Sequence, residues 1–361
     1  MNVLLLSKYP RMGASSRLRI LQFIPDLEAN GFDVTVSSLF DEDYLYNVYR
    51  KNSRSVLAIF RLYFRRLLAL LGSHKYDLIW IEKEIYPYLP AFAERWLNLS
   101  RRPYVVDYDD AIFHNYDLSG QPLIRHFLGR KIDTVMRRAG CVVAGNAYLA
   151  ERARAAGAPH VELIPTVVDH ERYAMRQGVG EQRPVIIGWI GSPSTQKYVV
   201  GIRDALAKAC QGHDARLMLV GASPQVTAEL PGVNVELLPW SEDREAEMIR
   251  MMDVGIMPLP DGPWEKGKCG YKLIQYMACG VPVVASPVGV NVDIVNGSQC
   301  GLLASSAADW VTALQTLLTS PELRAQFGTA GRRAVEEIYS LQAQAPVLRR
   351  ILSEAIGEGR S

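Results

Sequence analysis

Residues 266–287, KGKCGYKLIQYMACGVPVVASP, place a basic, glycine-containing loop directly before a predicted helix. Lys268, Cys269 and Gly270 end the loop. Apolar residues then recur at helical spacing until Gly280, which suits a helix end. The first amides of a helix lack partners within it and the helix dipole is positive there, so such a loop can bind an anion. We predict that it binds the phosphates of a nucleotide ligand; an ordinary loop–helix–strand unit is the alternative interpretation.

A second loop, GSPSTQK at 191–197, follows a predicted buried strand. Gly191 allows the backbone to turn closely, and polar side chains follow it. They are Ser192, Ser194, Thr195 and the compact cation Lys197. The sequence has neither a GxxxxGK[ST] phosphate loop nor a GxGxxG fingerprint, which argues against an ATPase or a dehydrogenase. Two basic loops of one sheet domain can converge on one pyrophosphate, and we predict that these two do.

Polar and charged residues also follow the predicted strands of the first half of the chain. They are Ser15, Ser16, Arg17, Glu82, Glu84, Asp107, Asp109 and Asp110, with Gly13 in the first of these loops and His114 shortly after the last. Ligands of parallel sheets bind beyond the carboxyl ends of the strands, so these residues are expected to line a cleft. A helix cap or a solvated edge is the more common role of any single acid of this kind.

Buried strands alternate with helices along the whole chain, which predicts parallel, doubly wound α/β sheets. The predicted strands are 3–6, 33–37, 78–81, 104–107, 141–144 and 161–164 in the first half, then 185–190, 216–220, 233–238, 254–257 and 281–285. The length of 361 residues suits two domains. We place them at 1–170 and 171–340, with a C-terminal helix in 341–361 that packs back on the first domain.

The composition limits the class of protein. With 48% apolar and 22% charged residues and a net charge of +2, the chain resembles an ordinary globular protein rather than a nucleic-acid-binding one. Five scattered cysteines fit a reducing compartment and predict neither a zinc site nor a disulfide framework. The first apolar run is too short for a signal peptide, and no run is long enough to span a membrane. These features predict a cytoplasmic protein.

Residues 44–76 contain no acidic side chain and many basic ones. Arg50, Arg54, Arg61 and Arg65 would share one helical stripe beside a dense apolar run. A basic amphipathic helix can lie on an anionic membrane, so 50–71 is a candidate membrane contact at the inner face of the plasma membrane. The alternative is a core helix whose arginines form its solvated face.

Residues 270–289, GYKLIQYMACGVPVVASPVG, resemble the signature of family 4 glycosyltransferases, which have the GT-B fold. Supporting similarities are 143–151, 164–173, 301–303 and 321–324. The resemblance implies two Rossmann-like domains that face each other across a cleft, with the donor held mainly by the second and the acceptor by the first. It also implies transfer of a sugar from a nucleotide-sugar, with retention of configuration and with no bound metal or cofactor besides that co-substrate.

Individual residues can be matched to the family motifs. Lys197 matches the phosphate-binding lysine, and Ser192 stands where the family has an arginine. Two glutamates that the family places eight positions apart are Gly267 and Gln275 here, so Gln275 is expected to bond a ribose hydroxyl, while Asp261 or Glu265 would replace the carboxylate lost at Gly267. The first-domain histidine matches Asp109, with Asp110 following.

The predicted site therefore has three parts. The catalytic residues are Lys197, Lys272 and Asp110. The donor-binding residues are Gly13, Gly191, Ser192, Ser194, Thr195, Lys268, Cys269, Gly270, Tyr271 and Gln275. The acceptor-side residues are Ser15, Ser16, Arg17, Asp109 and His114.

The function predicted is that of a retaining glycosyltransferase of cell-envelope or exopolysaccharide synthesis, with a glycan or lipid-linked acceptor and no nucleic-acid partner. Another GT-B enzyme, such as a nucleotide-sugar epimerase or a phosphorylase, is one alternative because unlike reactions share that fold. A non-catalytic nucleotide-sugar-binding protein is another.

Overall fold

The computed structural model describes residues 1–51, 56–176 and 183–358. The chain divides into two compact units, which we describe separately. The first is Met1–Thr166 together with the residues from Gln344 onward, and the second is Val167–Ala343. The domain limits predicted from the sequence, 170 and 340, differ from these by a few residues.

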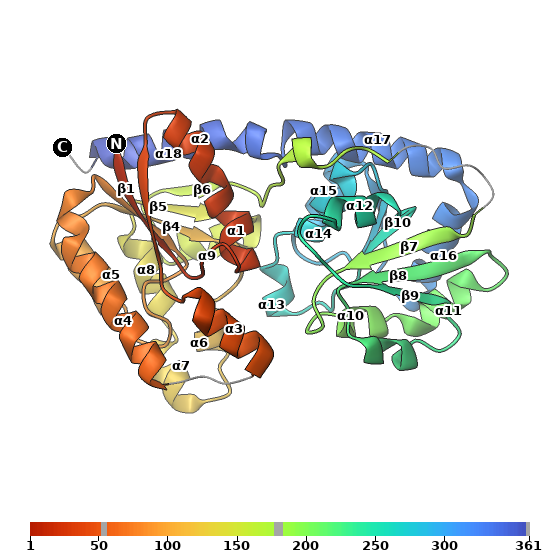
Figure 1. Cartoon of the computed structure of the whole chain (residues 1–361), viewed down its shortest axis with the longest axis horizontal. Coiled ribbons are helices and arrows are strands. Elements are labelled where there is room, and N and C mark those ends of the chain that lie inside the picture. The colour runs from red at the N-terminus through yellow and green to blue at the C-terminus, as the bar shows by residue number, and fades with distance from the viewer. Residues whose placement is uncertain (52–55, 177–182, 359–361) are drawn as a thin grey trace. The chain divides into compact units, whose positions relative to one another are not determined.

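In the described part of the first unit, six parallel strands form one sheet in the order β2-β1-β3-β4-β5-β6 (Figure 1). They are β1 (Asn2–Ser7), β2 (Asp33–Ser38), β3 (Leu78–Glu82), β4 (Tyr104–Tyr108), β5 (Cys141–Ala144) and β6 (Val161–Leu163). The central strands β3, β4 and β5 are buried along their whole length. Strands covered on both faces appear as continuous apolar runs, so the sequence reveals them. Because the strands are parallel, their carboxyl ends meet at one edge, here called the first carboxyl edge.

Helices connect these strands. They are α1 (Ala14–Arg19), α2 (Ile24–Ala29), α3 (Glu42–Lys51), α4 (Val56–Leu71), α5 (Phe92–Leu99), α6 (His114–Asp117), α7 (Pro122–Leu128), α8 (Lys131–Arg138) and α9 (Ala147–Ala155). A 3-10 turn at Leu21–Phe23 separates α1 from α2. Pro25 lies at the start of α2, where its missing amide costs no helical hydrogen bond.

The basic stretch forms two helices rather than one continuous stripe. Arg54 lies outside the described residues, and so does the side chain of Arg50. On α4, Arg61 pairs with Asp41 at 3.3 Å, and Arg65 donates to the carbonyl of Ser38 at 3.1 Å. These two arginines therefore attach α4 to the end of β2. Arg50 lies on α3, whereas Arg61 and Arg65 lie on α4, so these three of the four predicted arginines do not share one helix.

In the described residues of the second unit, six parallel strands are ordered β12-β11-β10-β7-β8-β9 (Figure 1). They are β7 (Val185–Ile190), β8 (Ala215–Val220), β9 (Val235–Leu238), β10 (Val254–Met257), β11 (Val283–Ala285) and β12 (Gly301–Leu303). Their carboxyl ends form the second carboxyl edge. Strand β12 was not predicted, because three half-buried residues give too short a pattern.

Apolar cores lie on both faces of this sheet. Along β7, Ile186 and Ile190 belong to one cluster, and Ile187 and Trp189 belong to the other, as the alternation of strand side chains requires. The helices are α10 (Lys197–Val200), α11 (Arg203–Cys210), α12 (Glu245–Arg250), α13 (Pro263–Lys266), α14 (Tyr271–Ala278), α15 (Val290–Ser298), α16 (Ala307–Thr319) and α17 (Pro321–Glu337).

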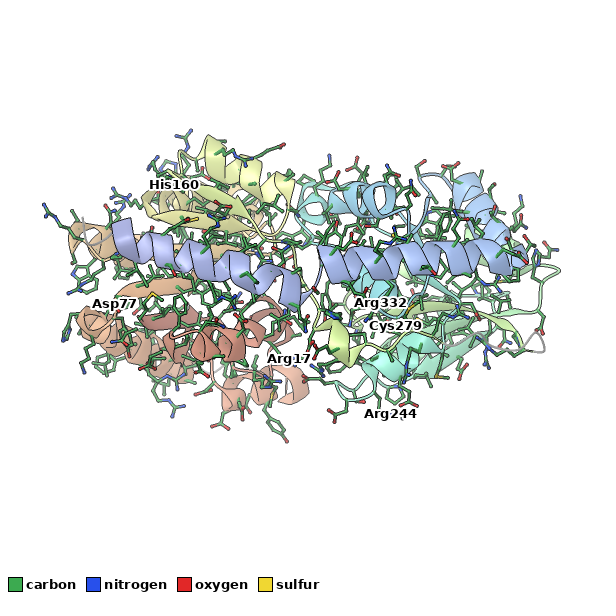
Figure 2. The ribbon with its side chains drawn as sticks, turned by 90° about the horizontal axis from the view of Figure 1, so that it is seen from above. Arg17, Asp77, His160, Arg244, Cys279 and Arg332 are labelled. Atoms are coloured by element: carbon green, nitrogen blue, oxygen red, sulfur yellow. The ribbon has the colours of Figure 1, made fainter. Side chains whose placement is uncertain are left out.

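Arg332 of α17 holds the beginning of the second unit in place. Its Nη1 donates to the carbonyls of Tyr173 at 2.6 Å and Ala278 at 2.7 Å, and Figure 2 shows it beside Cys279. The segment around Tyr173 is thereby fixed against α14 and α17.

The last helix, α18 (Leu341–Glu358), lies within the predicted range 341–361 and contains Pro346. Arg349 on this helix pairs with Asp26 of α2 at 2.5 Å, and Arg350 lies 3.4 Å from Glu162. The helix residues from Gln344 onward are thus tied to the first unit. Among the helices that the structure describes, none is long and apolar enough to cross a membrane.

Candidate functional site

The loop between β7 and α10 begins with a glycine that no other residue could replace without a clash. A Cβ on Gly191 would lie 2.4 Å from the Trp189 ring. The Ser192 hydroxyl lies 2.9 Å from that of Ser194, and the Thr195 hydroxyl donates to the Ser192 carbonyl at 3.0 Å. These contacts give the loop a defined shape, and Lys197 follows it as an exposed side chain at the start of α10.

The loop before α14 also has a glycine with a structural reason. Gly270 adopts φ of 68°, and a Cβ there would lie 2.5 Å from Ile294 Cδ1. No side chain caps the helix that starts at Tyr271, and its first turn holds no acidic residue. The thiol of Cys269 is buried and faces the Gly267 carbonyl at 3.9 Å. The amino end of α14 therefore keeps the positive character that suits an anion.

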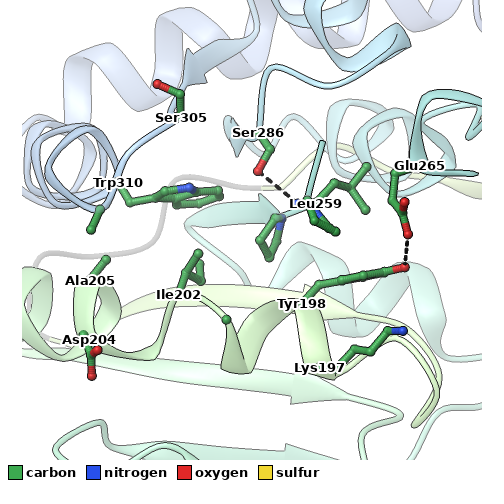
Figure 3. Close-up of a pocket in the computed structure, with 14 residues that line it drawn as sticks. Lys197, Tyr198, Ile202, Asp204, Ala205, Leu259, Glu265, Ser286, Ser305 and Trp310 are labelled. Carbon is green, nitrogen blue, oxygen red and sulfur yellow. Dashed lines mark hydrogen bonds between the residues drawn. The ribbon is translucent and has the colours of Figure 1, made fainter. Parts of the chain in front are cut away.

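These two loops lie next to each other at the second carboxyl edge. The Tyr198 hydroxyl at the start of α10 donates to Glu265 of α13 at 2.7 Å (Figure 3). The Lys272 ammonium lies 5.8 Å from the centre of the Trp189 ring, two residues before Gly191. Lys272 thus stands beside the strand that leads to the first loop. The structure brings together the two lysine-bearing turns on which the sequence prediction depends.

Asp261 and Glu265, the predicted replacements for the carboxylate that the family has at Gly267, both have partners within the protein. Glu265 accepts the bond from Tyr198, and Asp261 pairs with Lys266 at 3.1 Å. Gln275 is buried, and its amide donates to the Tyr173 hydroxyl at 3.2 Å. The amide of Gln275 is therefore committed inside the unit rather than open for a ribose hydroxyl.

The bond to Gln275 belongs to a buried network that ends at an exposed tryptophan. The Tyr173 hydroxyl donates to Glu245 at 2.6 Å, and the Trp240 indole donates to the same carboxylate at 3.0 Å. Burial, with Glu245 adjacent, raises the pKa of Tyr173 far above its usual range, so its proton stays. Trp240 is not among the residues predicted for the site, although an aromatic residue two positions after a predicted strand is a recognisable signal.

Trp240 lies close to the first loop. A Cβ on Gly221 would lie 3.2 Å from Trp240 Cβ and 2.4 Å from the Gly191 carbonyl oxygen. Gly221, with φ of 79°, therefore lies between Trp240 and the backbone of Gly191, where an added side chain would clash. The half-exposed indole is held at the second carboxyl edge, beside the predicted phosphate loop.

A pocket of about 540 Å³ opens beside α10 (Figure 3). Lys197, Tyr198, Leu259, Ser286 and Trp310 are among the residues that line it. Its size suits a small molecule. It meets the predicted site only at α10 and Glu265, however, and the amino end of α14 does not line it. A diphosphate is held by several cations or amides, and the two loops together offer more of these groups than this pocket does.

At the first carboxyl edge, a buried carboxylate organises the turn after β1. Glu82, at the end of β3, accepts hydrogen bonds from the Ser16 hydroxyl at 2.6 Å and from the Lys8 amide at 2.7 Å. The Ser15 hydroxyl reaches Asp109 at 3.2 Å. Ser15, Ser16 and Asp109 thus lie together at this edge, and Ser16 is fully buried and works as a link within the unit.

Lys83 is the functional-site candidate that the sequence did not reveal here. It adopts φ of 66°, which is disfavoured for a residue with a side chain. Its buried ammonium lies 2.7 Å from Asp109, 2.9 Å from the Ser15 hydroxyl and 3.7 Å from Asp110. Burial alone would lower the pKa of Lys83, but Asp109 and Asp110 raise it. Burial alone would raise the pKa of Asp109, but Lys83 lowers it.

Three other predicted residues have clear structural partners. Gly13 lies against Tyr9, since an added Cβ would fall 2.3 Å from Tyr9 Cβ. Arg17 is buried and donates to the Arg11 carbonyl at 3.3 Å. His114 contacts Asp117 through Nδ1 and the Tyr148 hydroxyl through Nε2, both at 2.8 Å. Because both ring nitrogens have partners in the first unit, His114 positions its neighbours rather than a ligand.

Family models match both units. A model described as "Glycosyl transferases group 1" matches residues 184–320, and one described as "Glycosyl transferase 4-like domain" matches residues 17–166. The first match covers both phosphate-loop candidates, and the second covers Glu82, Lys83 and Asp109 but begins after Ser16.

Curated relatives agree with these matches. The chain is 27% identical over 218 residues to a GDP-mannose-dependent alpha-(1-6)-phosphatidylinositol dimannoside mannosyltransferase of Mycobacterium tuberculosis, covering 56% of this chain and 55% of that protein. It is 29% identical over 195 residues to N-acetyl-alpha-D-glucosaminyl L-malate synthase of Bacillus anthracis, covering 50% of each. The chain thus spans about half the length of the curated relatives it matches.

Solved structures share the fold. Sucrose-phosphate synthase from Thermosynechococcus elongatus superposes with a TM-score of 0.72 at 16% identity, covering 99% of this chain and 100% of that one. Anabaena HepE in complex with UDP-glucose gives a TM-score of 0.68 at 17% identity, covering 98% of this chain and 100% of that one. With two parallel Rossmann-like sheets and matches to both family models, the chain belongs to the group 1 (family 4) glycosyltransferases of GT-B fold.

Proposed function

We propose that the protein transfers a sugar, with retention of configuration, from a nucleotide-sugar to a glycan or lipid-linked acceptor in cell-envelope or exopolysaccharide synthesis. The observation that carries this proposal is the convergence of the Lys197 loop and the amino end of α14 at one sheet edge. The solved relative HepE was crystallised with UDP-glucose, and the mannosyltransferase relative is named as GDP-mannose-dependent, which supports a nucleotide-sugar donor.

In this proposal the second unit supplies the electrostatics of the reaction. As the bond between the sugar and the diphosphate breaks, negative charge grows on the departing phosphate oxygen. Lys197, Lys272 and the first amides of α14 stabilise that charge, with Lys268, Tyr271 and the hydroxyls of the Gly191 loop around the phosphates. Trp240 is exposed and fixed, so it offers a face on which a nucleobase can stack. These groups perform the neutralisation without a bound divalent metal.

The first unit supplies the acceptor side. Asp110 is partly exposed at the first carboxyl edge, and its position depends on Lys83, which also holds Asp109 and Ser15. We assign Asp110 to the acceptor hydroxyl, with Asp109 and Ser15 as positioning residues. The phosphatidylinositol dimannoside named for the mycobacterial relative supports a lipid-linked acceptor.

The test uses the purified full chain with UDP-, GDP- and dTDP-sugars, with and without lipid extract as acceptor, and measures free nucleotide. Nucleotide released only when the acceptor is present supports the proposal. Isomerised sugar-nucleotide would indicate an epimerase, and donor binding without turnover would indicate a binding protein. Unchanged activity in EDTA is expected, and the proton coupling of the product's anomeric centre gives the stereochemistry.

A further inference from the structure

Helix α4 carries large apolar side chains on the face that points away from the unit. We call Leu57, Phe60, Phe64, Leu67, Leu68 and Leu71 the α4 apolar face. Leu57 is 81% exposed, Phe60 70% and Phe64 60%. Contiguous exposed patches of this kind on a monomeric protein usually mark an interaction site.

The opposite side of α4 already serves the core. Leu62, Arg66 and Leu70 are buried, and Arg66 donates to the Ser7 carbonyl at 2.5 Å. At about 100° per residue, the α4 apolar face covers an arc of roughly 100°, centred about 150° around the helix from these three. One side of α4 thus packs on the core of the unit, and the other side exposes apolar residues. Because the exposed residues do not pack on the core, the folding of the unit does not account for them.

The apolar surface extends beyond α4. The Tyr63 hydroxyl donates to the Pro87 carbonyl at 2.8 Å, and the Tyr63 ring lies 5.2 Å from that of Tyr86. Tyr86 in turn stacks with Phe92 of α5 at 5.7 Å. Phe92 is half exposed, as is Trp96 one turn later. Tyr63 and Tyr86 thus connect α4 to the half-exposed aromatic side chains of α5.

The charges on these two helices have one sign. The exposed charged side chains of α4 are Arg61 and Arg65, and that of α5 is Arg95. Glu94, the acid of α5, is buried and accepts the Ile85 amide at 2.9 Å. Arg61 and Arg65 border the α4 apolar face on the side next to β2. There Arg61 pairs with Asp41, and Arg65 donates to the Ser38 carbonyl. An apolar arc bordered by cations is complementary to an anionic lipid surface.

We propose that the α4 apolar face enters the acyl layer of an anionic bilayer leaflet, with the helix parallel to the membrane plane. Phe60 and Phe64 then lie below the headgroups, and Arg61 and Arg65 lie at their depth. Apolar insertion, rather than the arginine stripe predicted from the sequence, supplies most of the attachment. This deepens the proposed function, on which the lipid-linked acceptor rests, by giving the surface that brings the enzyme to that acceptor.

The experiment is co-sedimentation of the full chain with vesicles of two parts phosphatidylcholine to one part phosphatidylglycerol. Phe60→Ser with Phe64→Ser should weaken the partition on the order of a hundredfold, about tenfold for each ring removed from the acyl layer. A matched control, Leu163→Ser with Ile338→Ser, removes two exposed apolar side chains elsewhere and should sediment like the wild type. Both variants change exposed residues, so both should fold, which circular dichroism checks.

Three outcomes would overturn the proposal: wild type that does not sediment at low salt, a Phe60/Phe64 variant that sediments like wild type, or a dimer in sedimentation velocity that this variant dissociates. The last result would assign the face to a second copy of the chain. Donor binding, measured by calorimetry in the same preparations, should be equal in all three proteins. Vesicle binding without donor binding would contradict the proposed function, and the reverse would contradict only this inference.

Discussion

Replacing Lys83 by methionine should destabilise the first unit by about 3–5 kcal/mol at neutral pH, since it leaves a buried carboxylate without its partner. The ammonium lies 2.7 Å from Asp109, and burial of that side chain limits screening by water. Methionine has a similar length and needs the same left-handed backbone, so the strain at this position is kept. The change is thus confined to one charge and its hydrogen bonds.

The destabilisation should depend on pH in a defined direction. In the wild type the pKa of Asp109 is lowered, so its contribution is present above the unfolded pKa, about 3.9, and is lost as pH falls below it. Without Lys83, burial raises that pKa instead. As pH rises from about 3.9 to the raised pKa of Asp109, the free energy of unfolding of the variant falls. The fall is about 1.4 kcal/mol for each unit by which the raised pKa exceeds 3.9. The difference from wild type should therefore be smaller at pH 5 than at pH 8.

Hydrogen exchange read by mass spectrometry at peptides from β1, β3 and β4 reports the first unit alone, which a two-unit protein requires. Lys75→Met, on an exposed lysine, is the control and should exchange like wild type. A loss below about 1 kcal/mol for Lys83→Met that is equal at both pH values would refute the account of this ion pair.

Gly270→Ala should destabilise the second unit by about 1–3 kcal/mol and weaken donor binding, because Gly270 has φ of 68° and Ile294 blocks the added methyl. The control is Gly297→Ala in α15, where the space around the glycine is open, and thermal melting should show it to be neutral or stabilising. Trp240→Ala should raise the nucleotide Kd by roughly tenfold if the indole carries the base, while nucleotide-independent stability stays near wild type; an unchanged Kd in calorimetry would remove it from the site. Asp253→Ala should destabilise the second unit by about 3–5 kcal/mol, since this buried acid accepts two guanidinium groups and a strand amide; exchange of β7 amides at the wild-type rate would contradict this.

Short sequence patterns correctly predicted the buried strands and the glycines at helix ends, because neighbouring residues determine these features. Continuous apolar runs located the buried strands, and Gly270 and Gly280 stood where the structure needs left-handed glycines. Pairings between distant residues could not be predicted this way. Gln275 bonds Tyr173, and Lys83 bonds Ser15, because strand order and chain packing bring them together. No spacing in the sequence encodes these pairs.

The reading of α4 shows a different limit. Apolar residues lie on both sides of this helix, so periodicity does not tell which side faces the core. The arginines of this stretch suggested a solvated face. Arg66, however, is buried and donates to the carbonyl of Ser7, which lies 59 residues earlier in the chain. Burial lowers the pKa of Arg66 to about 10, so it stays charged at neutral pH. The outward apolar side became visible only in three dimensions.

The central claim is that the turns bearing Lys197 and Lys272 hold the diphosphate of the donor. Calorimetry of a nucleotide-sugar with wild type, Lys197→Ala and Lys272→Ala measures it, and Lys208→Ala on the exposed side of α11 is the control. Each site variant should raise Kd by roughly ten- to a hundredfold, as expected for a charged hydrogen bond to phosphate, and the control should not. Wild-type affinity in both site variants would contradict the account.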